Sequence, residues 1–341
     1  MDIISQIDRK LTQARRPLIV IHMHPDGDAL GSALALARIL RKEGKDVQIV
    51  SPDAIPDFLQ WMPDMDTVLQ ADRHPDQARQ AFRQADLIVM LDHNKPSRTG
   101  DLLEPMVEEA LKDKDFVMID HHLEPDPRIP LAWSLPGMSS TAEMVYDFLK
   151  QTGRLQRHGD PQTATQLYTG IMTDTGSFRF GTTTGDTHRA IADLIDMGAD
   201  NENIHVRVFD TFSYDKLQLL AHALQNMKYL PDCGATYMVL DKPTLEKFNH
   251  RPGYTEGIVN YGLSLDGVNF TALIKELPGL DRIRLSFRSK GDFDVNRFAR
   301  RYFEGGGHKN AAGGQSFDDI PTTVRRLEEA IRQHCREIAG K

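Results

Sequence analysis

Short apolar strands alternate with helical segments along the first half of the chain, and this alternation limits the possible folds most strongly. Four apolar runs, rich in branched side chains, are predicted to be buried strands: 17–21, 47–50, 87–91 and 116–119. Between the first two, residues 29–43 carry apolar or small side chains on one helical stripe, and Gly44 stands where a glycine ends a helix. Strands separated by helices predict an α/β fold with a mostly parallel, doubly wound sheet.

The predicted secondary structure changes twice after this first part. Residues 189–230 are largely helical, and after Pro231 strand-like runs return, followed by two further helical segments. Because 341 residues exceed the roughly 100–200 of a usual domain, two domains are expected. We predict a larger α/β domain over 1–188, a helical connector over 189–230 and a smaller α/β domain over 231–341.

Charge limits the partners of the chain. It holds 41 Lys and Arg residues against 49 Asp and Glu residues, a net charge of −8. Proteins that bind long nucleic acids present a basic face to many phosphates, and here only the short cluster 297–301 is basic. We therefore expect no long nucleic acid as partner. If the protein acts on nucleotides, they should be short ones held at a compact site.

The sequence also predicts where the protein works. The longest apolar runs are far shorter than the roughly 20 residues of a membrane span, and the charged N-terminus lacks a secretory signal. Cys233 and Cys335 are too few for a disulfide framework or a zinc knuckle. Cys335 shares an apolar helix face and is predicted to be in the core. We expect no membrane contact and a soluble protein in the reducing cytoplasm.

Histidines and aspartates gather where predicted strands end. The members of this set are His22, Asp26 and Asp28 after the first strand, Asp92 after the third, Asp120-His121-His122 after the fourth, and Asp174 after an apolar helical stretch. A single aspartate there is usually a cap or turn residue. Clusters at successive strand ends instead indicate one site, because ligands bind outside the carboxyl ends of strands in open α/β sheets. The small residues Gly31, Ala33 and Ala35 would let the first long helix pack close to the sheet.

The residue types in these clusters predict metal ions. Carboxylates and imidazoles without thiolates suit Mn²⁺ or Mg²⁺, with Fe²⁺ or Co²⁺ also possible, better than structural zinc. Four carboxylates, Asp26, Asp28, Asp92 and Asp174, carry four negative charges and so match two divalent cations. Paired metals roughly 3.5–4 Å apart activate a water and clamp the oxygens of an in-line displacement at phosphorus. The pattern therefore predicts phosphoester hydrolysis.

The second domain offers groups for binding an anion. Residues 304–314 form a dense glycine stretch whose backbone N–H groups can make an anion nest, and His308 and Asn310 add side-chain donors. Arg288, near the end of a predicted strand, could bind a phosphate bidentately. Flexible hinges look the same as a glycine loop. Together with a phosphoesterase site in the first domain, the stretch is predicted to clamp the substrate.

Taken together, these residues resemble the DHH phosphoesterase superfamily, named for the triplet that stands here as Asp120-His121-His122. The ordered set is His-x3-Asp-x-Asp, Asp92, the triplet, Asp174 and a C-terminal Gly-Gly-Gly-His like that of the associated DHHA1 domain, and it spans nearly the whole chain. Length and domain content are similar to the nanoRNase and pAp-phosphatase branch. Those bacterial enzymes degrade oligoribonucleotides of a few residues and 3′-phosphoadenosine 5′-phosphate (pAp).

The resemblance implies a role for each matching residue. One metal ion would be bound by His22, Asp26 and Asp92, and the other by Asp28, Asp92, His121 and Asp174, with Asp92 bridging. His122 would contact the phosphate or protonate the leaving oxygen. The residues implied to hold the terminal phosphate or base are Arg288, Gly306, Gly307 and His308. Arg98 matches an arginine that follows the second motif, and the family suggests a homodimer.

Two histidines depart from the family pattern. His24 and His93 add imidazoles at positions where the pattern demands none. For both, a supporting or solvated role is expected rather than metal ligation.

The leading hypothesis is a two-metal phosphoesterase that cleaves short oligoribonucleotides to mononucleotides, and also pAp to AMP. Hydrolysis of a linear or cyclic dinucleotide second messenger is the first alternative, and polyphosphate or pyrophosphate hydrolysis is another. Exonucleases of the RecJ type share the first motifs but need a surface for longer strands. A catalytically silent nucleotide-binding protein is the alternative outside the enzymes.

Overall fold

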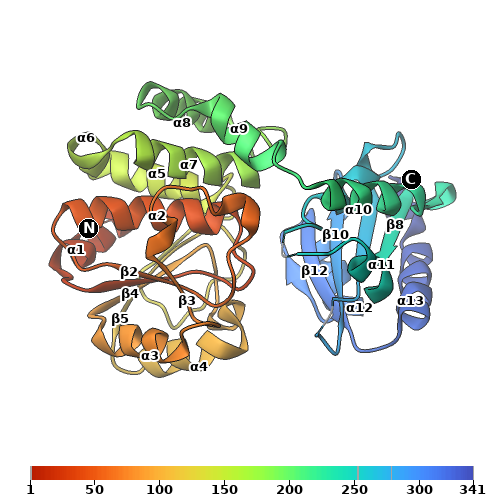
Figure 1. The fold of residues 1–341 in the computed structure, drawn as a ribbon, viewed down its shortest axis with the longest axis horizontal. Helices are drawn as coiled ribbons and strands as arrows, with labels where there is room; N and C mark the ends of the chain where they lie inside the picture. The colour runs from red at the N-terminus through yellow and green to blue at the C-terminus, as the bar shows by residue number, and fades with distance from the viewer. Residues whose placement is uncertain (1, 252, 278, 341) are drawn as a thin grey trace. The chain divides into compact units, whose positions relative to one another are not determined.

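Six parallel strands form the centre of the first unit, Met1–Thr211, of the computed structural model, which describes residues 2–251, 253–277 and 279–340 (Figure 1). Within these residues the strand order is β3-β2-β1-β4-β5-β6, and all neighbouring pairs are parallel. The order reverses between β1 and β4, the place where ligands bind in such sheets. The strands are β1 (Pro17–Val20), β2 (Gln48–Ser51), β3 (Val68–Gln70), β4 (Leu87–Leu91), β5 (Asp115–Asp120) and β6 (Ala132–Ser134).

Helices cover both faces of this sheet, which confirms the doubly wound α/β prediction. In Figure 1, α3 and α4 lie on one side of the sheet, and α2, α5 and α7 lie on the other. The helices of this unit are α1 (Ile3–Gln13), α2 (Gly27–Lys42), α3 (Pro75–Gln84), α4 (Gly100–Ala110), α5 (Thr141–Gln151), α6 (Arg154–His158), α7 (Pro161–Asp174), α8 (Gly185–Asp196) and α9 (Asn201–Phe209), with 3₁₀ turns η1 (Asp57–Leu59), η2 (Met65–Thr67) and η3 (Pro96–Thr99).

Two glycines bring three of these helices close together. A Cβ at Gly31 would lie 2.5 Å from the carbonyl oxygen of Gln166 in α7. A Cβ at Gly170 would lie 2.5 Å from the Cβ atom of Ala142 in α5. The expectation that Gly31 serves close packing on the sheet is therefore wrong, because its bare face meets a helix. The close contact of α2, α5 and α7 also brings Asp28 beside the backbone of α7, where the same Cβ at Gly170 would lie 3.3 Å from its carboxylate.

The boundary between the two units falls inside the predicted connector. The second unit is Phe212–Lys341, so the division lies within 189–230. Ile191 in α8 and Ile204 in α9 are buried in the core of the first unit, whereas Leu219 in α10 is buried in the core of the second. Each of these helices packs its apolar face into the core of its own unit.

A mixed six-stranded sheet forms the second unit among the described residues, in the order β11-β12-β10-β9-β8-β7. Among the strands that the structure describes in this unit, only β8 and β9 pair in parallel. A phenylalanine-rich core lies between the sheet and α12 and α13, and a second core lies under α10 and α11. The elements are α10 (Tyr214–Gln225), β7 (Lys228–Leu230), η4 (Pro231–Cys233), β8 (Ala235–Leu240), α11 (Lys242–Lys247), η5 (Ile258–Ser264), β9 (Phe270–Lys275), β10 (Ile283–Ser289), α12 (Val295–Tyr302), β11 (Gly306–Gly307), β12 (Ala311–Ser316), α13 (Ile320–Gln333) and α14 (Cys335–Ala339).

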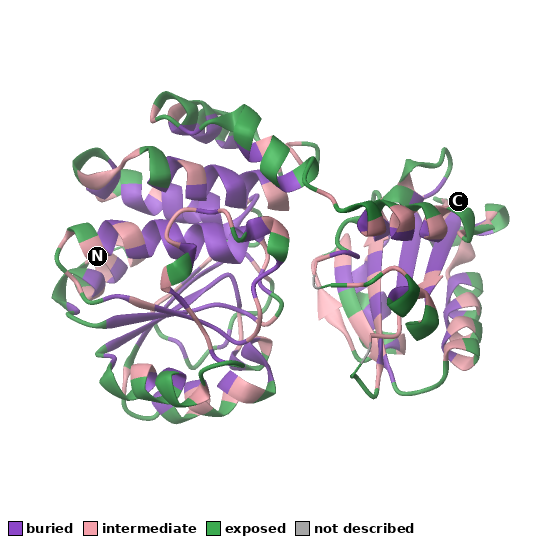
Figure 2. Cartoon of the chain, viewed as in Figure 1, coloured by how far each residue is buried: buried purple, intermediate pink, exposed green. Residues whose placement is uncertain are grey.

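Burial follows the pattern of the strands. In Figure 2 the strands of the first sheet are buried along most of their length, as expected for parallel strands covered on both faces. Along β10 buried and half-buried residues alternate, so one face of that strand is partly exposed. In the described parts of the chain, every helix is too short or too polar to cross a lipid bilayer.

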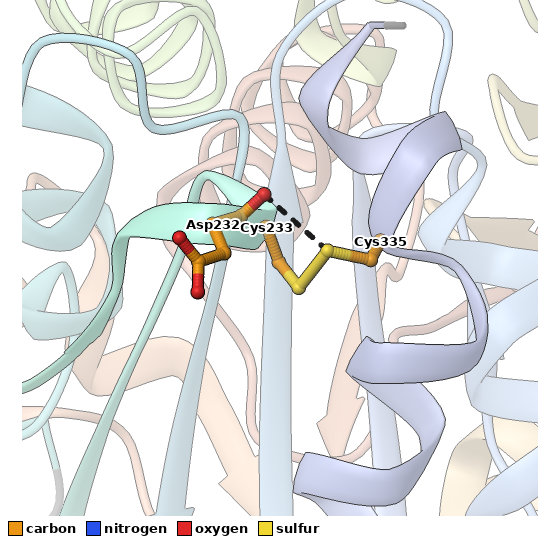
Figure 3. The surroundings of a disulfide bond; sticks show 3 residues. All are labelled: Asp232, Cys233 and Cys335. Carbon is orange, nitrogen blue, oxygen red and sulfur yellow. Dashed lines mark hydrogen bonds between the residues drawn. A yellow bond between two sulfur atoms is a disulfide. The ribbon is translucent and has the colours of Figure 1, made fainter.

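A disulfide joins Cys233 in η4 to Cys335 at the start of α14, 102 residues further along the chain (Figure 3). Two cysteines are too few for a disulfide framework, and nothing in the sequence predicted this single bridge between them. Cys335 was predicted to be in the core, but it is half-buried. The helix α13 ends at Gln333, and Cys335 begins the separate short helix α14. Residues so distant in sequence carry no local sign of contact, and only the fold brings them together.

Candidate metal centre

A histidine and two aspartates meet where the strand order reverses. His22 follows β1, Asp26 caps the N-terminus of α2, and Asp92 follows β4. The Nδ1–H of His22 donates to the carbonyl oxygen of Met23 at 2.9 Å, so its Nε2 faces the Asp92 carboxylate at 3.2 Å and that of Asp26 at 3.9 Å. Ligand atoms from these three residues lie within 4.8 Å of one another. One imidazole and two carboxylates at this spacing can hold a divalent cation.

A second group shares Asp92 with the first. Nε2 of His121, which follows β5, lies 3.5 Å from Asp92 Oδ1, 3.7 Å from Asp28 Oδ2 and 3.5 Å from Asp174 Oδ2. Asp28, Asp92 and His121 are buried and again offer ligand atoms within 4.8 Å of one another. Asp174 is the last residue of α7 and is half-buried. All six side chains predicted as ligands therefore meet at one edge of the sheet.

The N-terminus of α5 holds two of these carboxylates. The backbone N–H groups of Thr141 and Ala142 each donate to Asp28 at 2.7 Å, and the hydroxyl of Thr141 donates to Asp92 at 2.9 Å. Backbone N–H groups at a helix N-terminus favour negative charge. Nothing in the sequence indicates that the start of this helix faces Asp28, which lies 113 residues earlier in the chain.

The charges of the site repel each other without a cation. Burial, together with the charges of Asp92 and Asp174, raises the pKa of Asp28 well above its usual range. Burial also opposes ionisation of Asp92, yet the hydrogen bond from His22 and the nearby imidazoles hold the pKa of Asp92 below its usual range. Burial opposes a charged His22 as well, but Asp92 and Asp26 raise its pKa to about 9. The donor set thus fits divalent cations, which would relieve this repulsion.

His122 and Arg98 lie beside the two groups. Nδ1–H of His122 donates to Asp120 at 2.7 Å, and its Nε2 lies 3.4 Å from Nη2 of Arg98. Burial lowers the pKa of His122 well below its usual value and raises that of Asp120 to about 6. The backbone N–H of Met23 donates to the carbonyl of Arg98 at 2.8 Å, which ties η3 to the His22 loop. The sequence identified Asp120 only as part of the triplet and missed that it orients His122.

The two additional histidines differ from each other. His93 is fully buried, and its Nδ1–H donates to the carbonyl of Leu91 at 2.8 Å. Burial lowers the pKa of His93 to about 4. The side chain of His24 is 59% exposed and its ring pairs with Asp53. Among the described residues, neither histidine belongs to a group whose ligand atoms lie close enough to share an ion.

In the second unit, the glycine stretch forms a hairpin of β11 and β12 beside β10, where Arg288 pairs with Ala311. The backbone N–H of Gly307 donates to the side chain of Asn296 at 3.0 Å, and that of His308 donates to the carbonyl of Ala311 at 2.7 Å. The side-chain amide of Asn310 donates to Ser289 at 2.9 Å. The predicted anion nest is therefore wrong for these two N–H groups, because the side chain of Asn296 in α12 and the carbonyl of Ala311 already accept from them. Gly306 lies in the same short strand, β11.

Comparisons with known proteins cover nearly the whole chain. Residues 17–171 match the DHH family, N-terminal domain, and residues 235–337 match the DHHA1 domain. A Bacillus subtilis protein named bifunctional oligoribonuclease and PAP phosphatase NrnA is 28% identical over 323 residues, which cover 93% of this chain and 95% of that protein. A Streptococcus mutans protein named as a probable enzyme of the same kind is 30% identical and covers 91% and 94%. The crystal structure of an exopolyphosphatase-related protein from Bacteroides fragilis is 34% identical with a TM-score of 0.91, covering 98% and 97%.

Proposed function

The chain belongs to the DHH family, and on this premise we propose that it hydrolyses oligoribonucleotides of a few nucleotides to mononucleotides, and pAp to AMP. Similarity over more than nine-tenths of two proteins named for these activities supports the proposal. The observation that carries it is the pair of ligand groups that share Asp92 at the carboxyl edge of the first sheet. A site with two divalent cations is the kind that displaces groups at phosphorus.

The ligand groups divide between two cations. His22, Asp26 and Asp92 would hold the first, and Asp28, Asp92, His121 and Asp174 would hold the second. Mn²⁺ is the ion we propose, and Mg²⁺, Co²⁺ or Fe²⁺ suit the same donors. Such cations supply Lewis-acid activation of water and stabilise charge on the phosphoryl oxygens. The six side chains and the N-terminus of α5 provide the fixed frame that this chemistry requires.

His122 is the residue that we propose to handle the leaving oxygen. In the hydrolysis, water attacks phosphorus, the bond from phosphorus to the leaving oxygen breaks, and that oxygen takes up a proton. Asp120 accepts from Nδ1–H of His122, so the ring is held with Nε2 beside Arg98. Burial favours the neutral ring, and the negative charge of a bound phosphate favours its protonated form. His122 Nε2 then carries the proton for the leaving oxygen, and Arg98 contacts the phosphate.

The second unit would bind the far end of the substrate. We assign its terminal phosphate or base to Arg288, Gly306, Gly307, His308 and Asn310. Arg288 lies on the partly exposed face of β10, opposite the hairpin turn. The amide of Asn310 and the N–H groups of Gly307 and His308 already donate within the second unit, so their part is to shape the hairpin. Their acceptors are Ser289, Asn296 and Ala311, respectively. Arg288 and the His308 side chain are then the groups that contact the substrate.

The proposal is tested by supplying the full chain with Mn²⁺ and comparing a ribodinucleotide, pAp, a cyclic dinucleotide and polyphosphate. Turnover of the first two is expected. Turnover of only the cyclic dinucleotide or only polyphosphate would replace the proposal by that activity. Metal binding without turnover of any of the four would indicate a silent binding protein.

A variant of the shared ligand makes the test specific. Asp92→Asn should abolish Mn²⁺-dependent turnover, because the amide replaces one of the two carboxylate oxygens and removes the negative charge that both metal groups share. The fold should persist, because Asp92 has a φ of +61°, a backbone conformation that asparagine tolerates. Asp113→Asn is the matched control, as this exposed aspartate precedes β5 at the opposite edge of the sheet. Retained hydrolysis in Asp92→Asn would contradict the ligand assignment.

A further inference from the structure

His24 is held in a fixed orientation although its ring faces solvent. One carboxylate, that of Asp53, accepts from the backbone N–H of His24 at 2.9 and 3.1 Å and lies 2.7 Å from its ring Nδ1. Asp53 follows β2, the neighbour of β1, and its side chain is 25% exposed against 59% for His24. The clamp therefore joins two loops at the edge of the sheet where the metal ligands gather.

The backbone of His24 indicates that this orientation has a function. Its φ is +58°, in the left-handed region that glycine and asparagine adopt more readily than histidine. An exposed ring adds little to packing, so the core does not require histidine here. Strained residues that their surroundings hold in place cluster at functional sites. His24 stands two residues from His22 and two from Asp26, within the first ligand loop.

The Asp53 carboxylate decides which atom the ring offers to a ligand. An ionised carboxylate only accepts hydrogen bonds, so Nδ1 of His24 carries the proton that is donated to it. In the neutral imidazole, Nε2 is then an acceptor. Phosphodiester oxygens at neutral pH have no proton to donate to it. Beside the phosphate of an oligonucleotide, the nearest donors are the ribose hydroxyls, and the 2′-hydroxyl is the one that distinguishes RNA from DNA.

We propose that Nε2 of His24 accepts a hydrogen bond from the ribose 2′-hydroxyl beside the scissile phosphate and thereby makes the enzyme prefer RNA. This inference rests on the proposed function and adds a residue that selects the sugar. Asp53 is the positioning residue that sets the proton on Nδ1. A hydrogen bond of this kind changes kcat/KM by about tenfold.

The test compares ribo-, 2′-deoxy- and 2′-fluoro-dinucleotides with Mn²⁺ at pH 8. A 2′-fluorine is close in size to the hydroxyl but cannot donate. The unaltered chain should cleave the ribonucleotide about tenfold better than either analogue. His24→Asn suits the left-handed backbone and shortens the side chain, so it should lose about tenfold on the ribonucleotide and little on the analogues.

Asp53→Asn provides an independent test of orientation. Its amide can donate to Nδ1, which moves the ring proton to Nε2, and phosphate oxygens present in all three substrates can accept from it. The ribo-to-deoxy ratio should therefore fall while turnover persists. His158→Asn is the control, because His158 lies near a carboxylate, that of Glu43, at the far end of α2 and should leave the ratio unchanged.

The outcomes separate the two levels of inference. If the unaltered chain cleaves none of the dinucleotides, the proposed function fails. If it cleaves the ribonucleotide but His24→Asn keeps the ribo-to-deoxy ratio, only the role of His24 is refuted. An equal loss on all three substrates also refutes it, because His24 would then act on the phosphate or on the loop.

Discussion

Loading the metal centre with Mn²⁺ should release protons, and the number released should depend on pH. In the metal-free protein, Asp92 and Asp26 raise the pKa of His22 to about 9 although the ring is buried. The ring is therefore protonated at pH 7. A cation can bind Nε2 only after this proton leaves, so metal and proton compete for the same atom.

The size of the effect follows from this pKa. Below pH 9, each decrease of one pH unit should weaken the apparent Mn²⁺ affinity about tenfold, because one proton must leave His22. The raised pKa values of Asp28 and His121 can only add to the release. We therefore expect at least one proton per chain at pH 7 and fewer as the pH approaches 9.

The metal-free protein should show the linked change in stability. A group whose pKa is raised on folding stabilises the folded state below its unfolded pKa, and this contribution is lost as the pH rises through the folded value. For His22 the window runs from 6.5 to about 9. The contribution, about 3 kcal/mol, is full below pH 6.5 and disappears above pH 9.

Calorimetric titration of the chelator-treated chain with Mn²⁺ measures the release. Titrations at pH 7.0 and 8.5, each in two buffers of different ionisation enthalpy, give the number of protons. Asp92→Asn is the comparison, because loss of its carboxylate lowers the pKa of His22. An affinity that is equal at both pH values, with no buffer-dependent heat, would show that His22 does not lose a proton when Mn²⁺ binds.

Three further predictions concern side chains that support the site and the fold. Thr141→Val removes the hydroxyl that donates to Asp92 at 2.9 Å, and it should weaken Mn²⁺ affinity about 10-fold or more in the same titration. Gly170→Ala would place a methyl group 2.5 Å from Cβ of Ala142, so chemical denaturation should show a loss of about 1–3 kcal/mol, and an unchanged midpoint would contradict the tight helix contact. Cys335→Ser opens a loop closed over 102 residues and should lower the unfolding free energy by about 2–4 kcal/mol, as should a dithiol reductant acting on the unaltered chain.

Much of the fold could be predicted from local patterns. The strand predicted over 87–91 is β4 as observed, and the predicted doubly wound α/β fold is confirmed. Continuous apolar runs predict these strands well, because a strand buried on both faces of a sheet is apolar along its whole length. The strands β3 and β6 escaped prediction, since each has only three residues. The ligand positions could be predicted because each follows a strand or lies at the start or end of a helix, but their roles in turnover stay predictions.

Other features were beyond local patterns. The hydrogen bonds that occupy the N–H groups of Gly307 and His308 depend on a neighbouring helix and strand that glycine content does not reveal. The predicted connector over 189–230 divides between two cores, because helical periodicity shows that a face is apolar but not which core it meets.

Local sequence patterns are enough to predict most elements, the fold class and the histidines and aspartates at strand ends, because each of these depends on neighbours a few residues away. Which distant groups meet is known only from the folded structure. The N-terminus of α5 cradles Asp28 from 113 residues away, and Asp53 orients His24 because β2 lies beside β1. Such contacts depend on the packing of whole elements, and no local pattern indicates which elements become neighbours in the fold.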